Sequence, residues 1–160
     1  MIVKPIIPAI NTNAGINGNT ISYCKNANAV QLKNGDASII VLPNYQGRVM
    51  TSTAEGDKGF SFGWINHDLI ASGKQTPHFS AFGGEERFWL GPEGGQFSIY
   101  FKPKTNFTFE NWYVPPSLDT EGFDLISVSN TQASFYKKIH LLNYAGTKFD
   151  LEVNRKIKLL

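Results

Sequence analysis

The chain has 160 residues, of which 41% are hydrophobic and 13% aromatic, and its formal net charge is +2. This length suits one domain with its own core, and the composition is neither that of a disordered chain nor that of a fibrous one. The charge is too small and too dispersed to argue for nucleic-acid binding. No apolar run approaches the roughly 18 residues that a membrane helix requires, so no membrane span is predicted.

The cysteine, histidine and glycine patterns exclude several kinds of site. Cys24 is the single cysteine, so no disulfide can form within the chain, and the cysteine content does not indicate a cellular compartment. The three histidines lack the spacing of metal ligands. Glycine motifs that bind dinucleotides or phosphates are absent. We therefore predict neither a metal ion nor a cofactor.

The first third of the chain begins irregularly and continues as strands. Prolines, asparagines and glycines in residues 1–27 predict an irregular lead-in. The dipeptide Asn34-Gly35, between two strand-like segments, is the strongest short-range signal of a β-hairpin. Residues 43–47, with proline and glycine, predict the next turn. The strands expected here are residues 30–33, 37–42 and 48–53.

Aromatic residues dominate the middle of the chain. Phe60, Phe62 and Trp64 alternate with small residues, which predicts an aromatic strand packed on one face. Residues 66–82 show no clear period and predict a long loop with room for a helical turn. The other elements expected in this part are strands at residues 97–101 and 107–109 and a rigid, proline-containing connection over residues 112–121.

The last part of the chain has the clearest strand pattern. Residues 149–159 alternate between apolar and polar, and only Arg155 interrupts the apolar side. Further strands are expected at residues 123–128 and 133–142. With no helical period over ten or more residues, about nine short strands predict an all-β antiparallel sandwich. Because the chain ends on a strand, we expect the N-terminal part of a longer domain, with a plain terminal strand as the alternative.

Residues 82–97, FGGEERFWLGPEGGQF, combine five glycines with acids, an arginine and a tryptophan. Glycine-rich turns allow backbone to approach a ligand closely. Carboxylates and guanidinium groups bind hydroxyls in pairs, and an indole stacks on the C–H face of a sugar. We therefore predict a carbohydrate ligand held by Glu86, Arg87, Trp89 and Glu93. The alternative is a tight connection with solvated or paired charges and a buried Trp89.

His78 lies in the loop that leads into this glycine-rich block and could reach the same pocket. A single loop histidine is more commonly only solvated, which is the alternative for this residue. His140 lies on a predicted strand, beside Lys138 and opposite to its apolar neighbours. We expect it to be a surface histidine.

Four segments resemble a known family: GRVMTSTAEG (47–56), FGWIN (62–66), AFGGEERFWLGPEGGQFSIYF (81–101) and ENWYVPPSLDTEGFDL (110–125). They are similar to an uncharacterised bacterial family with the galactose-mutarotase-like fold, common in gut Bacteroidetes. The resemblance covers roughly residues 28–160. It implies an antiparallel β-supersandwich with a broad groove, of which residues 28–160 would be the N-terminal part, incomplete in this chain.

The resemblance also implies a function related to aldose 1-epimerases, in which an acid histidine and a base glutamate interconvert sugar anomers. Phe82-Gly83-Gly84 matches the His-Gly-Gly stretch of those enzymes, with a phenyl ring in place of the imidazole. Their acid and base lie further along than this chain extends, so no catalytic pair is assigned. Arg48 resembles the sugar-facing arginine of some relatives, with a structural ion pair as the alternative.

We therefore expect a carbohydrate-binding, aldose 1-epimerase-like protein. The alternatives are a non-catalytic carbohydrate-binding module of a bacterial glycan-utilisation system and a purely structural domain whose glycine-rich block packs on its own strands. A periplasmic or cell-surface location is favoured if an export signal has been trimmed. The identity of the sugar and the oligomeric state remain open.

Overall fold

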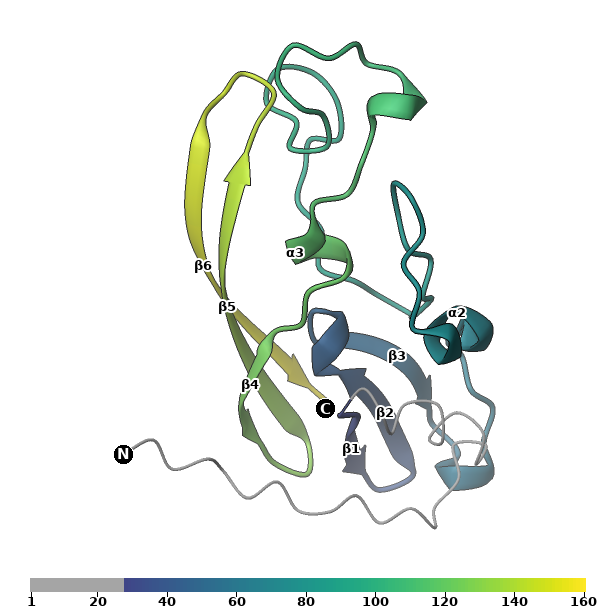
Figure 1. The fold of residues 1–160 in the computed structure, drawn as a ribbon. Helices are drawn as coiled ribbons and strands as arrows, with labels where there is room; N and C mark the ends of the chain where they lie inside the picture. The colour runs from purple at the N-terminus through teal and green to yellow at the C-terminus, as the bar shows by residue number, and fades with distance from the viewer. Residues whose placement is uncertain (1–27) are drawn as a thin grey trace.

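The computed structural model describes residues 28–160, so the lead-in predicted over residues 1–27 lies outside the described part. Six strands form two antiparallel sheets, in the orders β1-β2-β3 and β4-β5-β6 (Figure 1). They are β1 (Val30–Asn34), β2 (Ala37–Leu42), β3 (Arg48–Thr53), β4 (Asp124–Val128), β5 (Gln132–Leu142) and β6 (Lys148–Lys158). The predicted all-β class is confirmed for these residues.

The predicted first hairpin is present in β1 and β2. The register pairs Asn34 with Ala37, which leaves Gly35 and Asp36 as a two-residue loop. Gly35 has a φ of +58°. A positive φ at the first loop residue is typical of a type II′ turn, and glycine supplies it without a steric cost. The turn is therefore centred one residue later than the Asn34-Gly35 dipeptide predicts.

The first sheet is buried on both faces of β2, as its continuous apolar run predicts. Ile39 and Val41 belong to a cluster shared with β5, whereas Ile40 and Leu42 belong to a cluster on the opposite face. Ile70 of the short helix α2 (His67–Ser72) packs against this second cluster. The first sheet is therefore a middle layer, with the second sheet on one side and an irregular, partly helical segment on the other.

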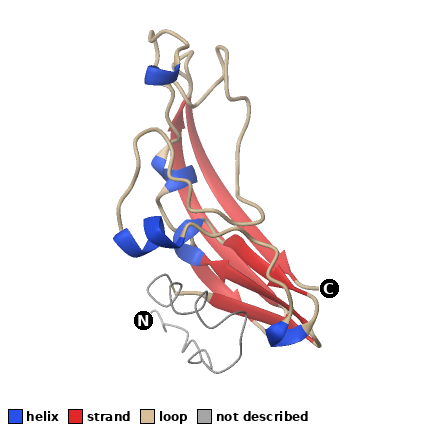
Figure 2. Cartoon of the chain, turned by 90° about the vertical axis from the view of Figure 1, so that its right-hand side faces the viewer, coloured by secondary structure: helices blue, strands red, loops and turns tan. Residues whose placement is uncertain are grey.

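Helices are short and lie in the connections (Figure 2). Besides α2 they are α3 (Pro116–Asp119) and the 3-10 turns η2 (Pro43–Tyr45), η3 (Gly56–Lys58) and η4 (Phe109–Asn111). The side chain of Asn66 accepts a hydrogen bond from the N–H of Leu69 at 3.1 Å, and Gly73 ends α2 in the left-handed conformation. The helical turn predicted within residues 66–82 is confirmed.

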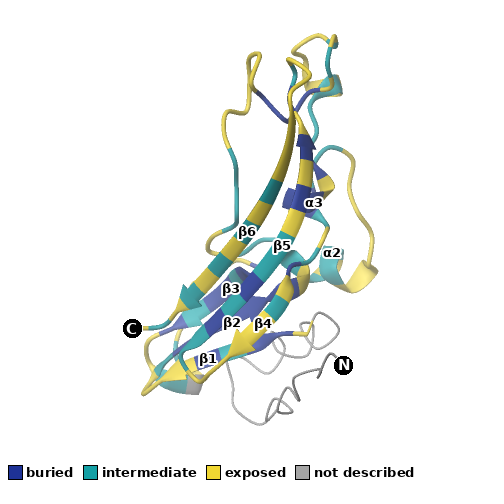
Figure 3. Ribbon diagram, turned by 90° about the vertical axis from the view of Figure 1, so that its left-hand side faces the viewer, coloured by how far each residue is buried: buried dark blue, intermediate teal, exposed yellow. Residues whose placement is uncertain are grey.

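The hairpin of β5 and β6 runs along most of the molecule (Figures 1 and 2). Towards the start of β5, Phe135 packs on the first sheet. Towards its end, Ile139 and Leu141 pack against residues 88–118 instead. From Asp150 onwards exposed and half-buried residues alternate along β6, as predicted, whereas Phe149 at its start is exposed (Figure 3). One hairpin therefore supports both the sheet and the long irregular segment that contains the glycine-rich block.

The aromatic strand predicted around Phe60, Phe62 and Trp64 is wrong. The N–H of Phe62 donates to the carbonyl of Ser52 on β3 at 3.1 Å, and Ile65 forms a single bridge with Gly83, but no continuous ladder forms. The three rings are 70%, 61% and 64% exposed. The alternating aromatic residues are therefore exposed rings and do not form the buried face of a strand.

The strands predicted at residues 97–101 and 107–109 are also absent. Phe97 is exposed, while Ile99, Tyr100 and Phe101 are consecutive buried residues, so the expected two-sided alternation fails. Residues 109–111 instead form the turn η4. Around Tyr100 no ladder forms, because its N–H donates to the hydroxyl of Ser98, and Phe101 forms only an isolated bridge with Trp112.

Candidate functional site

The first two glycines of the glycine-rich block are required by the packing of the protein itself. Gly83 and Gly84 have φ values of +91° and +110°. A Cβ atom on Gly83 would lie 2.3 Å from the carbonyl oxygen of Trp64, and one on Gly84 would lie 2.7 Å from Cδ of Arg48. These glycines therefore bring the backbone close to other parts of the chain, whereas Gly94, further along the block, faces open space.

Arg48 is inside the protein, with 1% of its surface exposed. Its Nη1 atom donates to the carbonyl of Gly83 at 2.9 Å, and its Nη2 atom donates to Oε1 of Gln46 at 3.0 Å. Burial is the main cause that lowers the pKa of Arg48 to about 10, and the nearby charge of Arg87 adds to it. The guanidinium of Arg48 thus joins the glycine pair to β3, away from any solvent-facing surface.

The two adjacent glutamates both bind β3, and Glu86 also binds β6. Glu85 Oε1 accepts the N–H of Ser52 at 2.6 Å. Glu86 Oε1 accepts the N–H of Val49 at 3.1 Å and forms an ion pair with Arg155. Arg155 is the residue that interrupts the apolar side of β6, and this pair explains its place there. Glu86 therefore ties the block to both sheets.

Arg87 is bound to α3 and packed between aromatic rings. Its Nη2 atom donates to the carbonyl of Leu118 at 2.6 Å and lies 3.4 Å from Oδ1 of Asp119. Its guanidinium carbon is 4.7 Å from the ring centre of Phe79 and 4.4 Å from that of Trp89. Burial lowers the pKa of Arg87, and the pairing with Asp119 opposes that shift. Its ion-pair partner therefore lies outside the glycine-rich block.

Trp89 is half-buried and begins a series of nearly parallel rings. Its Nε1–H donates to Oε1 of Glu93 at 2.9 Å. Its ring stacks on Tyr100 at 5.0 Å and 23°, Tyr100 stacks on Trp112 at 6.3 Å and 14°, and Trp112 stacks on Phe109 at 6.2 Å and 16°. The series runs from the glycine-rich block to η4, which joins two regions that are distant in the sequence.

Residues 112–114 run between two other segments near this end of the series. The N–H of Tyr113 donates to the carbonyl of Tyr100 at 3.0 Å, and the N–H of Val114 donates to the carbonyl of His78 at 2.8 Å. These backbone bonds place His78 beside the aromatic series. His78 itself has a φ of +67°, a left-handed conformation that is uncommon for a residue with a side chain.

A hollow of about 380 Å³ opens at this place, and we call it the polar hollow. It is lined by His78, Lys102, Thr105, Glu110, Asn111, Trp112 and Tyr113. The Nδ1 atom of His78 is hydrogen-bonded to the carbonyl of Trp112 at 2.5 Å, which fixes the ring and leaves Nε2 for a ligand. The hollow combines an imidazole, a cation, a carboxylate, an amide and a phenol around an indole.

The ionisation of two of these groups follows from their surroundings. Hydrogen bonds from its own backbone N–H and from the Thr108 hydroxyl lower the pKa of Glu110, with a smaller contribution from the charge of His78. Burial raises the pKa of Tyr113. At neutral pH the hollow therefore offers a carboxylate that accepts hydrogen bonds and a phenol that keeps its proton.

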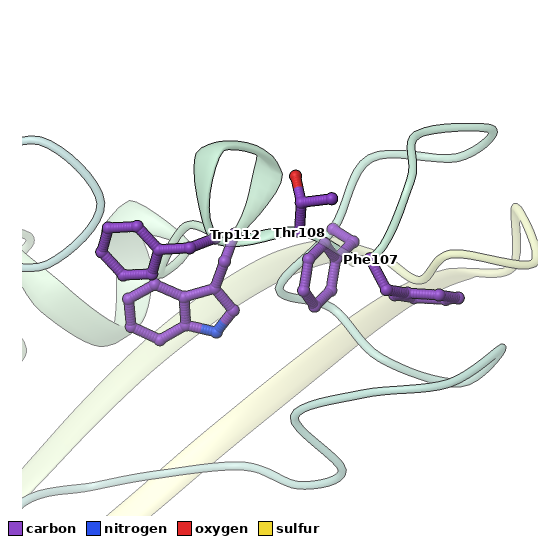
Figure 4. Close-up of a pocket in the computed structure, with 5 residues that line it drawn as sticks. Phe107, Thr108 and Trp112 are labelled. Atoms are coloured by element: carbon purple, nitrogen blue, oxygen red, sulfur yellow. The ribbon is translucent and has the colours of Figure 1, made fainter.

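A second hollow, of about 330 Å³, lies next to the first, and we call it the apolar hollow. It is lined by Phe101, Phe107, Thr108, Phe109 and Trp112. In Figure 4 Thr108 lies between Trp112 and Phe107. Since Trp112 lines both hollows, they are neighbours across one indole.

A third hollow, of about 450 Å³, lies at the first hairpin and is lined by Gln31, Lys33, Gly35 and Asn130. It contains no aromatic side chain on which a sugar ring could stack.

Of the six residues predicted to bind a ligand, His78 lines the polar hollow. Arg87, Trp89 and Glu93 lie together within the glycine-rich block, Glu86 turns towards the sheets and Arg48 lies inside. The sequence interpretation missed the other residues of the hollow. The segment Glu-Asn-Trp-Tyr at residues 110–113 could have indicated this hollow, because it combines an acid, an amide and aromatic rings.

Two general features bear on the site. Among residues 28–160, no three His, Cys, Asp or Glu side chains converge as they would to hold a metal ion. No helix within the same residues has the length and apolar character needed to cross a membrane. His140, predicted at the surface, is exposed and pairs across the hairpin with Asp150.

Comparison with known proteins gives a family and no named relative. The sequence matches the Family of unknown function (DUF6786) over residues 19–160, and the chain belongs to this family. No curated protein matches the chain. No solved structure matches it either.

Proposed function

We propose that this member of the DUF6786 family binds a carbohydrate in the polar hollow. The observation that carries the proposal is the set of side chains around Trp112, in which hydrogen-bonding groups of both signs surround an aromatic ring. Sugar sites need this combination, because a pyranose has hydroxyls around its edge and C–H groups on its faces. The resemblance to galactose-mutarotase-like proteins supports the same ligand class and the supersandwich to which these two sheets would belong.

Each group would have a distinct role. The ring of Tyr113 would pack against the C–H face of the sugar, and the edge of Trp112, whose ring is stacked on Tyr100 and Phe109, would contact it. Glu110 would accept hydrogen bonds from a pair of hydroxyls, whereas Lys102 would donate to a hydroxyl or ring oxygen. Asn111 can donate and accept, although its Nδ2 atom already donates to the carbonyl of Asn106 at 3.0 Å. The volume of about 380 Å³ lies at the lower end of the range for small-ligand pockets, which suits one sugar ring.

The glycine-rich block is less suited to be the main binding surface. Arg87 already donates to α3, and Trp89 already packs against Arg87 and Tyr100. Glu93 is exposed but accepts the Trp89 N–H. The block would instead fix the aromatic series, whose other end reaches the polar hollow.

A second function, exchange of sugar anomers, is favoured by one observation: an imidazole and a carboxylate line the same hollow. With His78 as the imidazolium, whose Nδ1–H donates to the carbonyl of Trp112, Nε2–H would protonate the ring oxygen while Glu110 takes the proton from the anomeric hydroxyl, so that the C1–O5 bond breaks. Rotation of the open-chain aldehyde and closure from the other face would give the second anomer and return both protons. Exchange NMR of a bound sugar would show cross-peaks between anomers, and Glu110→Gln should abolish them.

Binding is tested by calorimetric titration of the full chain with methyl glycosides of glucose, galactose, mannose and N-acetylglucosamine. We expect Glu110→Gln to weaken binding of the sugar that binds best by about tenfold, since a charge-assisted hydrogen bond contributes roughly 1.5 kcal/mol. Glu55→Gln is the matched control, because Glu55 is exposed and lines none of the three hollows. The proposal is wrong if no sugar binds, or if Glu55→Gln and Glu110→Gln weaken binding equally.

A further inference from the structure

We propose that the apolar hollow receives the apolar substituent of a sugar bound in the polar hollow, so that the natural ligand is a glycoside with an aryl or alkyl aglycone. This inference rests on the proposed carbohydrate binding and specifies its ligand class, and it excludes anomer exchange on that ligand, because a glycoside has no anomeric hydroxyl. A free reducing sugar would fill the polar hollow and leave the aromatic one empty.

The first argument is the continuity of the two hollows. Trp112 lines both. One turn supplies residues to both in succession: Phe107, Thr108 and Phe109 to the apolar hollow, then Glu110 and Asn111 to the polar one. The two sides of the turn are also bonded to each other, since the Nδ2 atom of Asn111 donates to the hydroxyl of Thr108 at 3.4 Å. A ligand that crosses the edge of Trp112 would therefore contact both hollows without any movement of the chain.

The second argument is the chemistry of the lining. Apart from the hydroxyl of Thr108 and the N–H of Trp112, the side chains of the apolar hollow are hydrocarbon rings, and no charged residue lines it. Phe107 and Phe109 are 50% and 68% exposed, so their ring edges and faces are accessible. Exposed rings in tilted and edge-on pairs, such as Phe107 with Phe101 at 5.0 Å, offer the contacts that a further ring prefers.

The third argument is size. The apolar hollow has about 330 Å³, which lies at the lower end of the range for small-ligand pockets. A protein partner would need an interface of roughly 800 Å² on this chain, far more than five residues around one hollow provide. A small substituent attached to the sugar is therefore the occupant that fits best.

The experiment compares matched ligands on the full chain by calorimetry. Each methyl glycoside of the four sugars named above is paired with the p-nitrophenyl glycoside of the same sugar and anomer, and p-nitrophenol alone is the third probe. We expect the aryl glycoside of the preferred sugar to bind about tenfold more tightly than the methyl glycoside, because buried aromatic contact adds to the sugar contacts. Phe107→Ala should remove most of this advantage and leave the methyl glycoside unchanged. Phe97→Ala, at an exposed ring that lines neither hollow, is the control and should change neither.

The outcomes separate this inference from the proposed function. Equal affinity for methyl and aryl glycosides would overturn the inference while carbohydrate binding stands. An aryl advantage that survives both Phe107→Ala and Phe109→Ala would also overturn it, because the aglycone would then lie elsewhere. If p-nitrophenol alone binds as tightly as the aryl glycoside, the apolar hollow is an independent site and the inference is wrong. Failure of every glycoside to bind would remove the proposed function and the inference together.

Discussion

At the scale of single residues, the charged groups that first suggest a ligand are largely engaged by the protein. Arg87 binds the carbonyl of Leu118 and pairs with Asp119, and Glu86 pairs with Arg155. The sequence shows that charged residues and glycines gather in this block. It does not show which residues they bind, because their partners lie tens of residues away in the chain. His78 is the opposite case, because contacts with residues 112–114 place a single loop histidine at the polar hollow.

The pair of Arg87 and Asp119 gives a stability prediction. Arg87→Ala would leave Asp119 largely buried without its cation, so we expect the free energy of unfolding to fall by about 3 kcal/mol. Urea denaturation at pH 7 measures this change. Lys138→Ala is the control, since Lys138 and Glu152 form an exposed pair whose loss should have no measurable effect. Equal midpoints for Arg87→Ala and the native chain would show that Arg87 has no structural role.

Tyr100 gives a pH-dependence prediction. Burial raises the pKa of Tyr100 to about 12. The folded state therefore keeps a proton that the unfolded state releases near pH 10, so the contribution of Tyr100 to stability is complete below pH 10 and falls as the pH rises towards 12. The lowered pKa of Arg48, about 10, acts in the opposite direction over the same window, so the native chain alone is not informative.

Comparison of the native chain with Tyr100→Phe isolates the tyrosine. At neutral pH the variant should be less stable, because it lacks the hydrogen bond from the Tyr100 hydroxyl to the carbonyl of Leu90. The difference in unfolding free energy should shrink between pH 10 and pH 11.5, measured by urea titration at each pH. A difference that stays constant over this range would contradict a raised pKa for Tyr100.

At the scale of elements, local signals predict the strands well when the partner strand is adjacent in sequence. The first hairpin and the β5–β6 hairpin are recovered, because a glycine turn and a two-residue period specify them locally. The strands expected at residues 60–64 and 97–101 are wrong, because aromatic alternation does not distinguish a paired strand from an irregular segment. Only long-range contacts decide between these two outcomes.

Gly47, between η2 and β3, gives the prediction at this scale. It has a φ of +65°, and a Cβ atom there would lie 2.8 Å from the ring of Phe135 in the core. We expect Gly47→Ala to lower the free energy of unfolding by about 2–3 kcal/mol through backbone strain and the displaced ring. Gly94→Ala has neither feature and should be nearly neutral in the same chemical denaturation experiment. Equal effects of both substitutions would mean that the turn tolerates a side chain.

At the scale of the whole molecule, the β5–β6 hairpin supports two regions with different roles. One half packs on the first sheet, and the other half supports the aromatic series that ends at the two hollows. The turn after β5 also reaches this region, since the Tyr144 hydroxyl donates to the carbonyl of Thr105 at 2.9 Å. Most of the residues around the hollows belong to irregular segments, and the β5–β6 hairpin and its turn support these segments.

The three tryptophans provide the most direct test of the central claim, because Trp112 lines the hollows, Trp89 lies in the glycine-rich block and Trp64 lies outside both. The measurement is an NMR titration of the ¹⁵N-labelled indole signals with the methyl glycoside that binds best, each signal being assigned with a Trp→Phe variant. We predict that the Trp112 signal shifts progressively to saturation while the Trp64 signal does not move. A saturating shift of Trp89 or Trp64 with Trp112 unchanged would contradict carbohydrate binding in the polar hollow.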